Sequence, residues 1–308
     1  MLVYTEMMTT GALMHGDVAR HLRFHGAEHP IGLQLGGSDP QELAHCARLA
    51  ERWGYDEINL NCGCPSERVQ RGAFGACLMA EPQLVASCLR AMQDAVSIPV
   101  TVKHRLGIDR FEDYDFARRF VEALAKQGCR TFIVHARSAV LKGLTPKDNR
   151  EVPPLRYADV YRLKCEFPQL TIVINGGISS LAQIEQHLAH VDGVMLGRAA
   201  YHNPYLLAEA KYHFNGGGAR ATRAQVVESM YEYTRGELLE GASLRAIVRH
   251  MLGLFHGQPR ARVWRQMLCD AQRLGNNDPG LLLEALEAMG SASAEGCAPL
   301  RLCTAVRS

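Results

Sequence analysis

Short apolar runs alternate with longer segments of helical periodicity along the first two-thirds of the chain. The runs are four to six residues long, and most are rich in valine and isoleucine. They lack strict apolar–polar alternation, which is typical of parallel strands covered on both faces. The pattern therefore predicts seven buried strands, at Leu2–Thr5, Ile31–Leu35, Glu57–Asn61, Ile98–Lys103, Thr131–His135, Thr171–Asn175 and Gly193–Gly197.

The spacing between these strands leaves room for a crossover helix each time. One such helix is well delimited, because Asp39 is a good N-cap and Pro40 suits the first helical position. Glu42 is placed to complete a capping box, and Gly54 is placed to end the helix. The chain is thus expected to repeat a strand–helix–strand unit.

The alternation continues to about residue 213 and then stops. Residues 215–219 form a linker by composition, and only helical patterns follow it. We expect a barrel domain over 1–213, a helical domain over 219–289 and a disordered tail over 290–308. The predicted helices of the second domain are Gln225–Leu239, Ser243–Phe255 and Gly280–Met289.

Repeated parallel units are compatible with an open doubly wound sheet or with a closed (β/α)8 TIM barrel. In barrels, functional groups gather at the carboxyl ends of several strands, and polar residues stand at most of the predicted strand ends here. A dinucleotide-binding sheet would carry G-x-G-x-x-G after its first strand, and that motif does not occur. The pattern favours an α/β fold of the TIM-barrel type, followed by an all-helical domain.

Composition narrows the class of protein. The 308 residues are 47% hydrophobic and 21% charged, which excludes wholesale disorder. The sequence shows neither a signal peptide nor an apolar run near the ~20 residues of a membrane helix. Ten cysteines without an export signal indicate free thiols in the cytoplasm rather than a disulfide scaffold.

The last two predicted strands each run into a glycine feature, Asn175-Gly176-Gly177 and Gly197-Arg198. Glycines at such turns expose backbone N–H groups, and barrels often bind phosphate after strands seven and eight. Ordinary tight turns are the alternative. Because both turns carry the feature and Arg198 adds charge, a phosphate site is favoured.

The segment from Asn61 to Cys64 follows the third visible strand. The side-chain amide of Asn61 offers donors and an acceptor suited to a uracil-like edge. Cys64 precedes a proline, which places it in a loop, where it could be a nucleophile, an acid or a metal ligand. We expect no metal site, because Cys62 and Cys64 lack a second Cys or His pair at matching spacing.

Lys103 and His135 each stand at the end of a predicted strand. Lys103 could form a Schiff base or serve as a fixed cation. His135 taken alone could be a structural histidine. Because several polar residues stand at strand ends, a functional site at that end of the barrel is a better interpretation than a purely structural role for each residue.

Positive charge is concentrated in two places, although the formal net charge of the chain is only +2. Residues 136–150 form a basic loop that contains Arg137, Lys147 and Arg150. Between residues 243 and 275, six arginines, including Arg262 and Arg265, stand against a single acid. Such a local excess is expected for a surface that binds a phosphate backbone, and a solvated helix face is the alternative.

These motifs together resemble the tRNA-dihydrouridine synthases, specifically the A-type subfamily, over roughly residues 2 to 270. The resemblance rests on all of these motifs in combination, because a single motif such as Asn-Gly-Gly would be weak evidence for a family. The matching stretches include Tyr4-Thr5-Glu6-Met7, Gln34-Leu35-Gly36-Gly37, Asn61-x-Gly63-Cys64-Pro65-Ser66, Val102-Lys103-x-Arg105, His135-Ala136-Arg137, Pro146-Lys147-x-Asn149-Arg150, Asn175-Gly176-Gly177 and Gly197-Arg198.

The resemblance implies a flavin-dependent oxidoreductase acting on a CH–CH group, with FMN as cofactor, NADPH as reductant and tRNA as partner. Uridines 20 and 20a of the D-loop would receive hydride at C6 and a proton from Cys64 at C5. By carry-over, FMN would bind Gln34, Lys103, His135, Asn175, Gly176, Gly177, Gly197 and Arg198, with Lys103 as a cation rather than a Schiff base. Asn61 would hold the uracil, and Arg137, Lys147, Arg150, Arg262 and Arg265 would contact tRNA.

The family begins with a strand that has no counterpart here, since Leu2–Thr5 corresponds to its second strand. If the glycine turns follow strands seven and eight, the seven visible strands are numbers two to eight. We therefore expect Met1 to be an internal methionine and the chain to lack about one βα unit, roughly 30 residues.

Two other functions remain open at this point. Another FMN barrel that acts on a free pyrimidine, such as a dihydroorotate dehydrogenase-like enzyme, would explain the flavin features but not the basic helices. A flavin-free RNA-binding protein would follow if the missing strand is needed for flavin binding. For the favoured enzyme we expect a monomer with no membrane or metal partner.

Overall fold

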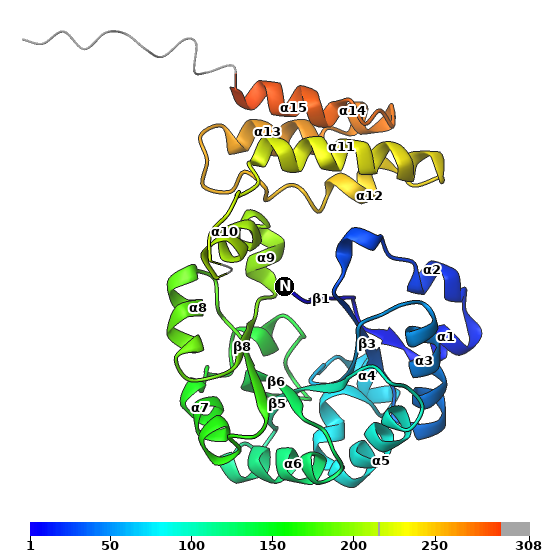
Figure 1. Ribbon diagram of the computed structural model, residues 1–308, viewed down its shortest axis with the longest axis vertical. Coiled ribbons are helices and arrows are strands. Elements are labelled where there is room, and N and C mark those ends of the chain that lie inside the picture. Colours follow the sequence, from blue (N-terminus) through cyan, green and yellow to red (C-terminus); the bar gives the residue numbers. More distant parts are fainter. Residues whose placement is uncertain (215, 291–308) are drawn as a thin grey trace, which may run out of the picture. The chain divides into compact units, whose positions relative to one another are not determined.

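The computed structural model describes residues 1–214 and 216–290, excepting the side chains of residues 68 and 71. These residues form two compact units, one from Met1 to Gly197 and one from Arg198 onward (Figure 1). The first unit is built on a parallel sheet, whereas the described part of the second is helical. The predicted tail lies almost wholly outside the described residues.

The sheet of the first unit confirms all seven predicted strands. Every pairing is parallel, and β1 and β2 are two short pieces that both pair with β3. The order β1-β3-β4-β5-β6-β7-β8 follows the chain, as expected for successive strand–helix–strand units. The strands are β1 (Val3–Tyr4), β2 (Met8–Thr9), β3 (Ile31–Gly36), β4 (Glu57–Cys62), β5 (Val100–Ile108), β6 (Thr131–Ala139), β7 (Thr171–Asn175) and β8 (Gly193–Met195).

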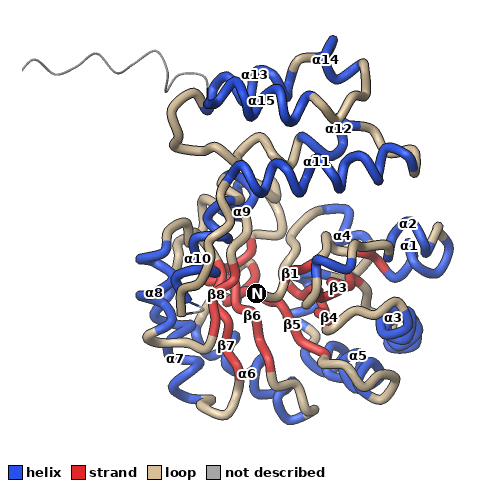
Figure 2. The backbone as a smooth tube through the Cα atoms, turned by 45° about the horizontal axis from the view of Figure 1, so that its top comes forward, coloured by secondary structure: helices blue, strands red, loops and turns tan. Residues whose placement is uncertain are grey.

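Helices cover the outside of this sheet, which curves as the wall of a (β/α) barrel (Figures 1 and 2). The TIM-barrel prediction is therefore confirmed. Within the described residues β8 pairs with β7 alone, and no pairing joins it to β1. The helical elements are α1 (Thr10–His15), α2 (Val18–Leu22), η1 (Gly26–Glu28), α3 (Pro40–Arg52), α4 (Glu67–Arg71), η2 (Gly75–Ala80), α5 (Pro82–Gln93), α6 (Tyr114–Lys126), η3 (Asp148–Arg150), α7 (Tyr157–Glu166) and α8 (Leu181–Leu188).

Helix α3 begins as predicted, and one detail of its capping differs. The Asp39 carboxylate accepts hydrogen bonds from the backbone N–H groups of Gln41 and Glu42, and Pro40 occupies the first turn. The expected capping box is absent, because the Glu42 carboxylate instead accepts a 2.7 Å hydrogen bond from the Thr10 hydroxyl. Glu42 thus binds a residue distant in the chain instead of its own helix terminus, and this hydrogen bond connects α3 to α1.

The strands carry apolar residues on one face and polar residues on the other. In β3 and β4, Leu33, Ile58 and Leu60 are fully buried on the face of the sheet that the helices cover. The alternate positions hold Asn59 and Asn61, which are also buried. Strand β4 thus does alternate, contrary to the expectation for these strands, and because its polar side chains are buried as well, the alternation does not mark a solvent-exposed face.

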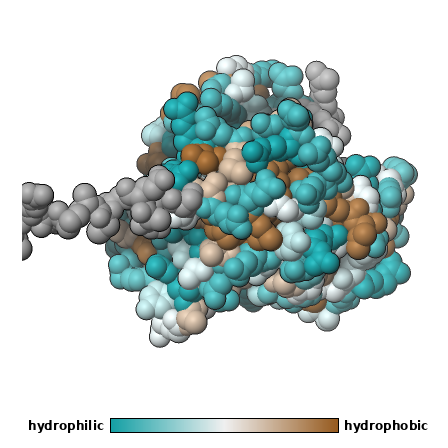
Figure 3. All heavy atoms as spheres, turned by 90° about the horizontal axis from the view of Figure 1, so that it is seen from above, coloured by the Kyte–Doolittle hydropathy of each residue, from teal (hydrophilic) through white to brown (hydrophobic). Residues whose placement is uncertain are grey.

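The outer face drawn in Figure 3 shows hydrophobic residues in small groups separated by hydrophilic ones. Single exposed apolar side chains such as Val152 and Leu239 are common on folded proteins. Among the described residues, no helix combines the length and the hydropathy that crossing a membrane requires.

The second unit begins earlier than the predicted domain boundary at residue 213. Two helices before the glycine linker belong to it, because the Tyr205 side chain packs into its hydrophobic core. Gly216, Gly217 and Gly218 of the linker all have positive φ, a conformation that glycine adopts without strain. The helices are α9 (Arg198–His202), α10 (Tyr205–Phe214), α11 (Arg223–Leu239), α12 (Leu244–Val248), α13 (Ala261–Cys269), α14 (Ala271–Gly275) and α15 (Leu281–Gly290).

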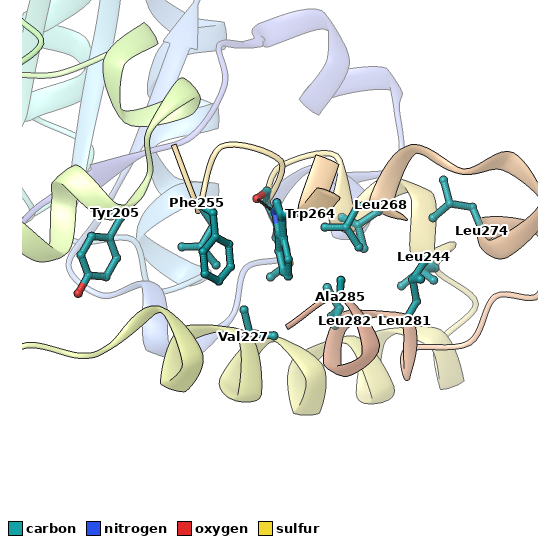
Figure 4. Packing of buried hydrophobic residues seen from close by; sticks show 13 residues of the cluster. Tyr205, Val227, Leu244, Phe255, Trp264, Leu268, Leu274, Leu281, Leu282 and Ala285 are labelled. Atoms are coloured by element: carbon teal, nitrogen blue, oxygen red, sulfur yellow. Dashed lines mark hydrogen bonds between the residues drawn. The ribbon is translucent and has the colours of Figure 1, made fainter. Parts of the chain in front are cut away.

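The core of the second unit is centred on Trp264, which is fully buried (Figure 4). Its ring contacts Phe255 with a centroid distance of 4.7 Å, and its indole N–H donates to the Met251 carbonyl at 2.9 Å. Leu268 of α13 and Leu282 of α15 complete the surrounding apolar layer. An indole buried with its N–H satisfied is a strong anchor for a small domain.

Two of the three predicted helices of this unit are confirmed, as α11 and α15, and the prediction for residues 243–255 was too long. Helix α12 ends at Val248, and turns follow it. A Cβ atom on Gly253 would lie 2.1 Å from the His202 carbonyl oxygen, so this segment is shaped by close backbone contact. Helix α13 was not predicted.

We expect Trp264→Ala to lower the free energy of unfolding of the helical unit by about 3–5 kcal/mol, because it opens a cavity in the core. Loss of helical circular dichroism with urea measures this. Leu239→Ala is the matched control, since Leu239 is 89% exposed, and it should shift stability by less than about 0.5 kcal/mol. Equal effects of the two substitutions would contradict the assignment of Trp264 as the anchor.

Candidate active site at the carboxyl ends of the strands

The register of the sheet brings the predicted strand-end residues onto neighbouring strands. Asn61 of β4 is the partner of Lys103 in β5, and His135 of β6 is the partner of Asn175 in β7. Because these strands are parallel, their carboxyl ends meet at one end of the sheet. We call the end of the sheet marked by Asn61, Lys103, His135 and Asn175 the mouth.

Three side-chain amides form a hydrogen-bonded row below the mouth. The Gln34 side-chain N–H group donates to Asn59 Oδ1 at 2.9 Å, and the Asn61 side-chain N–H group donates to Gln34 Oε1 at 2.8 Å. Asn59 in turn donates to the Thr101 hydroxyl at 2.9 Å. The predicted residues Gln34 and Asn61 are thus in direct contact, on adjacent strands.

The backbone of the Cys64 loop is held from two sides. Asn61 Oδ1 accepts hydrogen bonds from the N–H groups of Gly63 and Cys64, at 3.0 and 2.9 Å. On the other side the Cys64 carbonyl accepts from Ala76 N–H at 2.9 Å. Gly75 makes this approach possible, since a Cβ there would lie 2.6 Å from the Cys64 carbonyl oxygen.

The Cys64 side chain is partly exposed and makes a hydrogen bond to Ser66. Its Sγ donates to the Ser66 hydroxyl at 3.6 Å, and Ser66 is the N-cap of α4. Cys62, by contrast, is fully buried, and burial raises its pKa well above the ordinary value. Of the two thiols in this loop, Cys64 is therefore the one available for chemistry.

Lys103 is a cation held at the mouth of a largely apolar barrel. Burial lowers its pKa from 10.5 to about 8; the Arg105 charge acts in the same direction, and Cys64 acts in the opposite one. Within the part of the chain that the structure describes, its ammonium makes no hydrogen bond or ion pair. Its position thus suits an anionic or strongly polar ligand.

Arg105 holds the loops around the mouth, a role that the sequence pattern did not reveal. The residue is 3% exposed, and its guanidinium donates to the carbonyls of Gly63 at 2.8 Å, Ser138 at 3.0 Å and Asn149 at 2.9 Å. Burial lowers its pKa to about 10. The only signal in the sequence was its spacing, two residues beyond Lys103 on the same strand face.

The turn after β7 requires glycine at two successive positions. Gly176 and Gly177 have φ of +119° and +71°, and a Cβ on Gly176 would lie 2.7 Å from the His135 ring. The Tyr157 hydroxyl donates to the Gly176 carbonyl at 2.7 Å. His135 and the glycine turn therefore lie side by side at the mouth, and the phosphate site at this turn stays a prediction.

The other predicted residues of this end occupy the last two strand ends. The Asn175 side chain donates to the Met195 carbonyl at 2.8 Å, which joins β7 to β8. Gly197 is exposed, and Arg198 is the exposed first residue of α9. The boundary between the two compact units falls between these two residues.

The basic loop is folded around Asn149, which is fully buried. Asn149 Oδ1 accepts from Val140 N–H at 2.7 Å, and its side-chain N–H group donates to the Val140 carbonyl at 2.8 Å. Lys147 and Arg150 are exposed on the loop. Arg137 is nearly buried and donates to the carbonyls of Glu151 and Pro153, so it supports the loop, and its contact with tRNA stays a prediction.

Arg262 and Arg265 lie in the second unit on helix α13, and both are exposed. Trp264, between them in sequence, points into the core. Helix α13, which was not predicted, places Arg262 and Arg265 on the same face, because residues three apart in a helix are neighbours. Its apolar residues Val263, Trp264, Met267 and Leu268 were the signal that could have located it.

No group of three or more His, Cys, Asp or Glu side chains is gathered as a metal site within the described residues. The eight cysteines of these residues are all free thiols.

Several known proteins are similar to the chain. A tRNA-dihydrouridine(20/20a) synthase from Synechocystis sp. is 57% identical over 290 residues, which are 93% of this chain and 86% of the relative. The protein of that name from Salmonella typhi is 55% identical over 288 residues, with the same coverage of 93% and 86%. The one from Vibrio parahaemolyticus is 53% identical over 288 residues, or 93% and 87% of the two chains.

A model of the dihydrouridine synthase family matches residues 1–290. This match spans the barrel and the helical unit alike. With relatives more than half identical over most of their own length, the chain belongs to the dihydrouridine synthase family.

Proposed function

We propose that this protein reduces uridines of tRNA to dihydrouridine, at positions 20 and 20a of the D-loop, with FMN as its cofactor and NADPH as its reductant. The observation that carries the proposal is the Cys64 loop, which Asn61 holds near Lys103, a cation that has no hydrogen-bond or ion-pair partner among the described residues. A proton donor, an amide and a cation at one mouth are what reduction of a uracil ring needs.

The residues at the mouth fit FMN in its charge and its polarity. Lys103 offers a half-buried positive charge, and the positive-φ glycines 176 and 177 form a turn that no side chain can fill. The amides of Gln34 and Asn61 provide donors and acceptors for a polar ring edge. We propose that the cofactor is held by Gln34, Lys103, His135, Asn175, Gly176, Gly177, Gly197 and Arg198.

When bound, FMN supplies the hydride that adds to C6 of the uracil ring. The Sγ of Cys64 delivers a proton to C5 of the same ring, on which negative charge would otherwise accumulate. Asn61 keeps the Cys64 loop in place and orients the uracil through its remaining N–H. Lys103 contributes positive charge close to the reacting groups.

The exposed arginines favour a polynucleotide over a free pyrimidine. Arg262 and Arg265 share a face of α13, and Lys147 and Arg150 are exposed on the basic loop. Phosphate contacts of this kind position an RNA without reading its sequence. The target uridine leaves its stack to reach the mouth, so part of the binding free energy offsets unstacking. Arg137 is included in the proposed tRNA contacts.

The full chain with FMN, NADPH and unmodified tRNA is expected to form dihydrouridine, measured by mass spectrometry of the digested tRNA. Cys64→Ala should lower the rate by about 10²–10⁴-fold, because the ring loses its proton donor. Cys165→Ala is the control, since that thiol is exposed on α7. Undiminished turnover by Cys64→Ala would refute the acid role, and turnover of free uridine without tRNA would refute the substrate.

Lys103→Met should weaken FMN binding by the apoprotein by about 10- to 100-fold, because a charge-assisted contact is lost. The parent should also lose affinity from pH 7 to 9. Its lysine is protonated below a pKa of about 8 and neutral above it, so binding at higher pH must take up a proton. Quenching of flavin fluorescence measures both effects.

Lys103→Arg is the matched control, because arginine stays charged over that range. Its pH profile should be flat from pH 7 to 9, as should that of Lys103→Met. If the parent and Lys103→Met lose affinity in parallel as the pH rises, another group is responsible and the assignment is wrong.

Arg262→Ala and Arg265→Ala should each weaken tRNA binding and reduce the slope of log affinity against log salt by about 0.7–0.9. Arg235→Ala is the control, because Arg235 forms an ion pair with Glu232 at 2.9 Å on the neighbouring helix α11. It should leave the slope unchanged. Filter binding at several salt concentrations measures the slopes, and equal slopes for all three variants would exclude α13 from the tRNA surface.

A further inference from the structure

We propose that Glu57, Thr101 and Tyr4 form a positioning relay that sets the orientation of the amides at the mouth and thereby holds the Cys64 loop. None of the three touches the reacting groups in this proposal. They act through Asn59, Gln34 and Asn61. The consequence for the reaction rests on the function proposed above, whereas the consequence for the loop does not.

The relay begins at the amino-terminal end of β4. There one carboxylate oxygen of Glu57 accepts two hydrogen bonds, from the Tyr4 hydroxyl at 2.6 Å and from the Thr101 hydroxyl at 2.6 Å. A carboxylate only accepts, so both hydroxyl protons are directed to it. The other acceptor near Thr101, the Ile58 carbonyl, is more distant at 3.4 Å.

Each later bond has its direction forced by the one before it. Because the proton of Thr101 is committed, its oxygen accepts from Asn59. Asn59 Oδ1 then faces the Gln34 N–H group, and Gln34 Oε1 faces the Asn61 N–H group. Asn61 Oδ1 is left to accept from the backbone of the Cys64 loop. Reversing any one amide would set two donors or two acceptors against each other.

The surroundings keep the relay in this state. Asn59 and Thr101 are buried, so a reversed amide would lack water as an alternative partner. Burial raises the pKa of Glu57, while the bonds from Thr101 and Tyr4 act in the opposite direction and favour the carboxylate. Burial and Glu57 raise the pKa of Tyr4 far above its usual range, so the phenol remains a donor.

The relay joins residues of the four strands β1, β3, β4 and β5 and runs from one end of the barrel toward the other. It starts at the first residue of β4, passes through β5 and β3, and ends at the loop after β4. Within the described residues each of the three amides keeps one N–H without a hydrogen-bond partner, and Gln34 Oε1 keeps one lone pair. The polarity set at Glu57 thus fixes which atom is donor and which is acceptor at the mouth.

Thr101→Val tests the relay, because it removes the hydroxyl and keeps the shape. The Asn59 amide then lacks its acceptor, and the amides above it are free to reverse. The protein as isolated, without tRNA, is treated with iodoacetamide, and peptide mass mapping gives the rate at Cys64 relative to the exposed Cys165. We expect this ratio to rise by at least about threefold, because the loop opens more often.

Thr101→Ser should restore the parent ratio, because it keeps the hydroxyl. Thr234→Val is the matched control, since Thr234 is fully buried and its hydroxyl donates to the Met230 carbonyl at 2.6 Å in the other unit. It should leave the ratio unchanged. A parent-like ratio in Thr101→Val, or a ratio in Thr101→Ser as high as in Thr101→Val, would overturn the relay.

A second variant and a second measurement keep the test decisive if Thr101→Val does not fold. Glu57→Gln keeps the size of the side chain but can donate as well as accept, so it should raise the same ratio. With tRNA, both variants should lower kcat by about tenfold with little change in KM, because the proton donor is misplaced after binding. Alkylation needs no turnover, so failure of the proposed reaction leaves the relay test intact.

Discussion

The buried guanidinium of Arg105 is the interaction on which the architecture of the mouth depends. Three carbonyls, from Gly63, Ser138 and Asn149, converge on it from the Cys64 loop, the end of β6 and the basic loop. Loops at the end of a barrel have few backbone partners of their own. A planar guanidinium spreads its fixed donors over several atoms, so it can reach carbonyls of three separate segments, whereas the donors of a lysine all sit on one nitrogen.

Arg105 also explains the unusual state of Lys103. Both side chains stand on the same face of β5, and the charge of Arg105 adds to burial in lowering the lysine's pKa. Arginine has its carbonyls, whereas lysine has no protein partner among the described residues. The free protein therefore holds an uncompensated cation in place, and a ligand with negative charge removes that cost when it binds. Strand β5 thus supplies both the residue that holds the loops, Arg105, and the residue that attracts an anion, Lys103.

The sequence predicted the barrel well, because strand burial depends on local composition. The runs of Val and Ile located all seven strands, and the strand-end rule located Gln34, Asn61, Lys103, His135 and the glycine turn. What it missed depends on partners distant in the chain. The Glu42 carboxylate binds the Thr10 hydroxyl instead of completing the predicted capping box. Gly253 packs against the backbone of His202, in a segment that was predicted to be helical. Arg137 read as a surface cation, yet carbonyls of residues 151 and 153 hold it inside.

The two compact units solve different physical problems. At the mouth of the barrel, Arg105 and the amides of Asn59 and Asn61 are buried, so their interactions depend little on salt and strongly on orientation, and a reversed amide is costly. On the helical unit, Arg262 and Arg265 are exposed, so their attraction to phosphate is long-ranged, screened by salt and tolerant of side-chain motion. A net charge of only +2 conceals this division, because it averages the two regimes. In the proposed function, exposed cations such as Arg262 and Arg265 attract the polyanion, whereas the buried groups of the mouth place one base, so the two tasks rest on different residues.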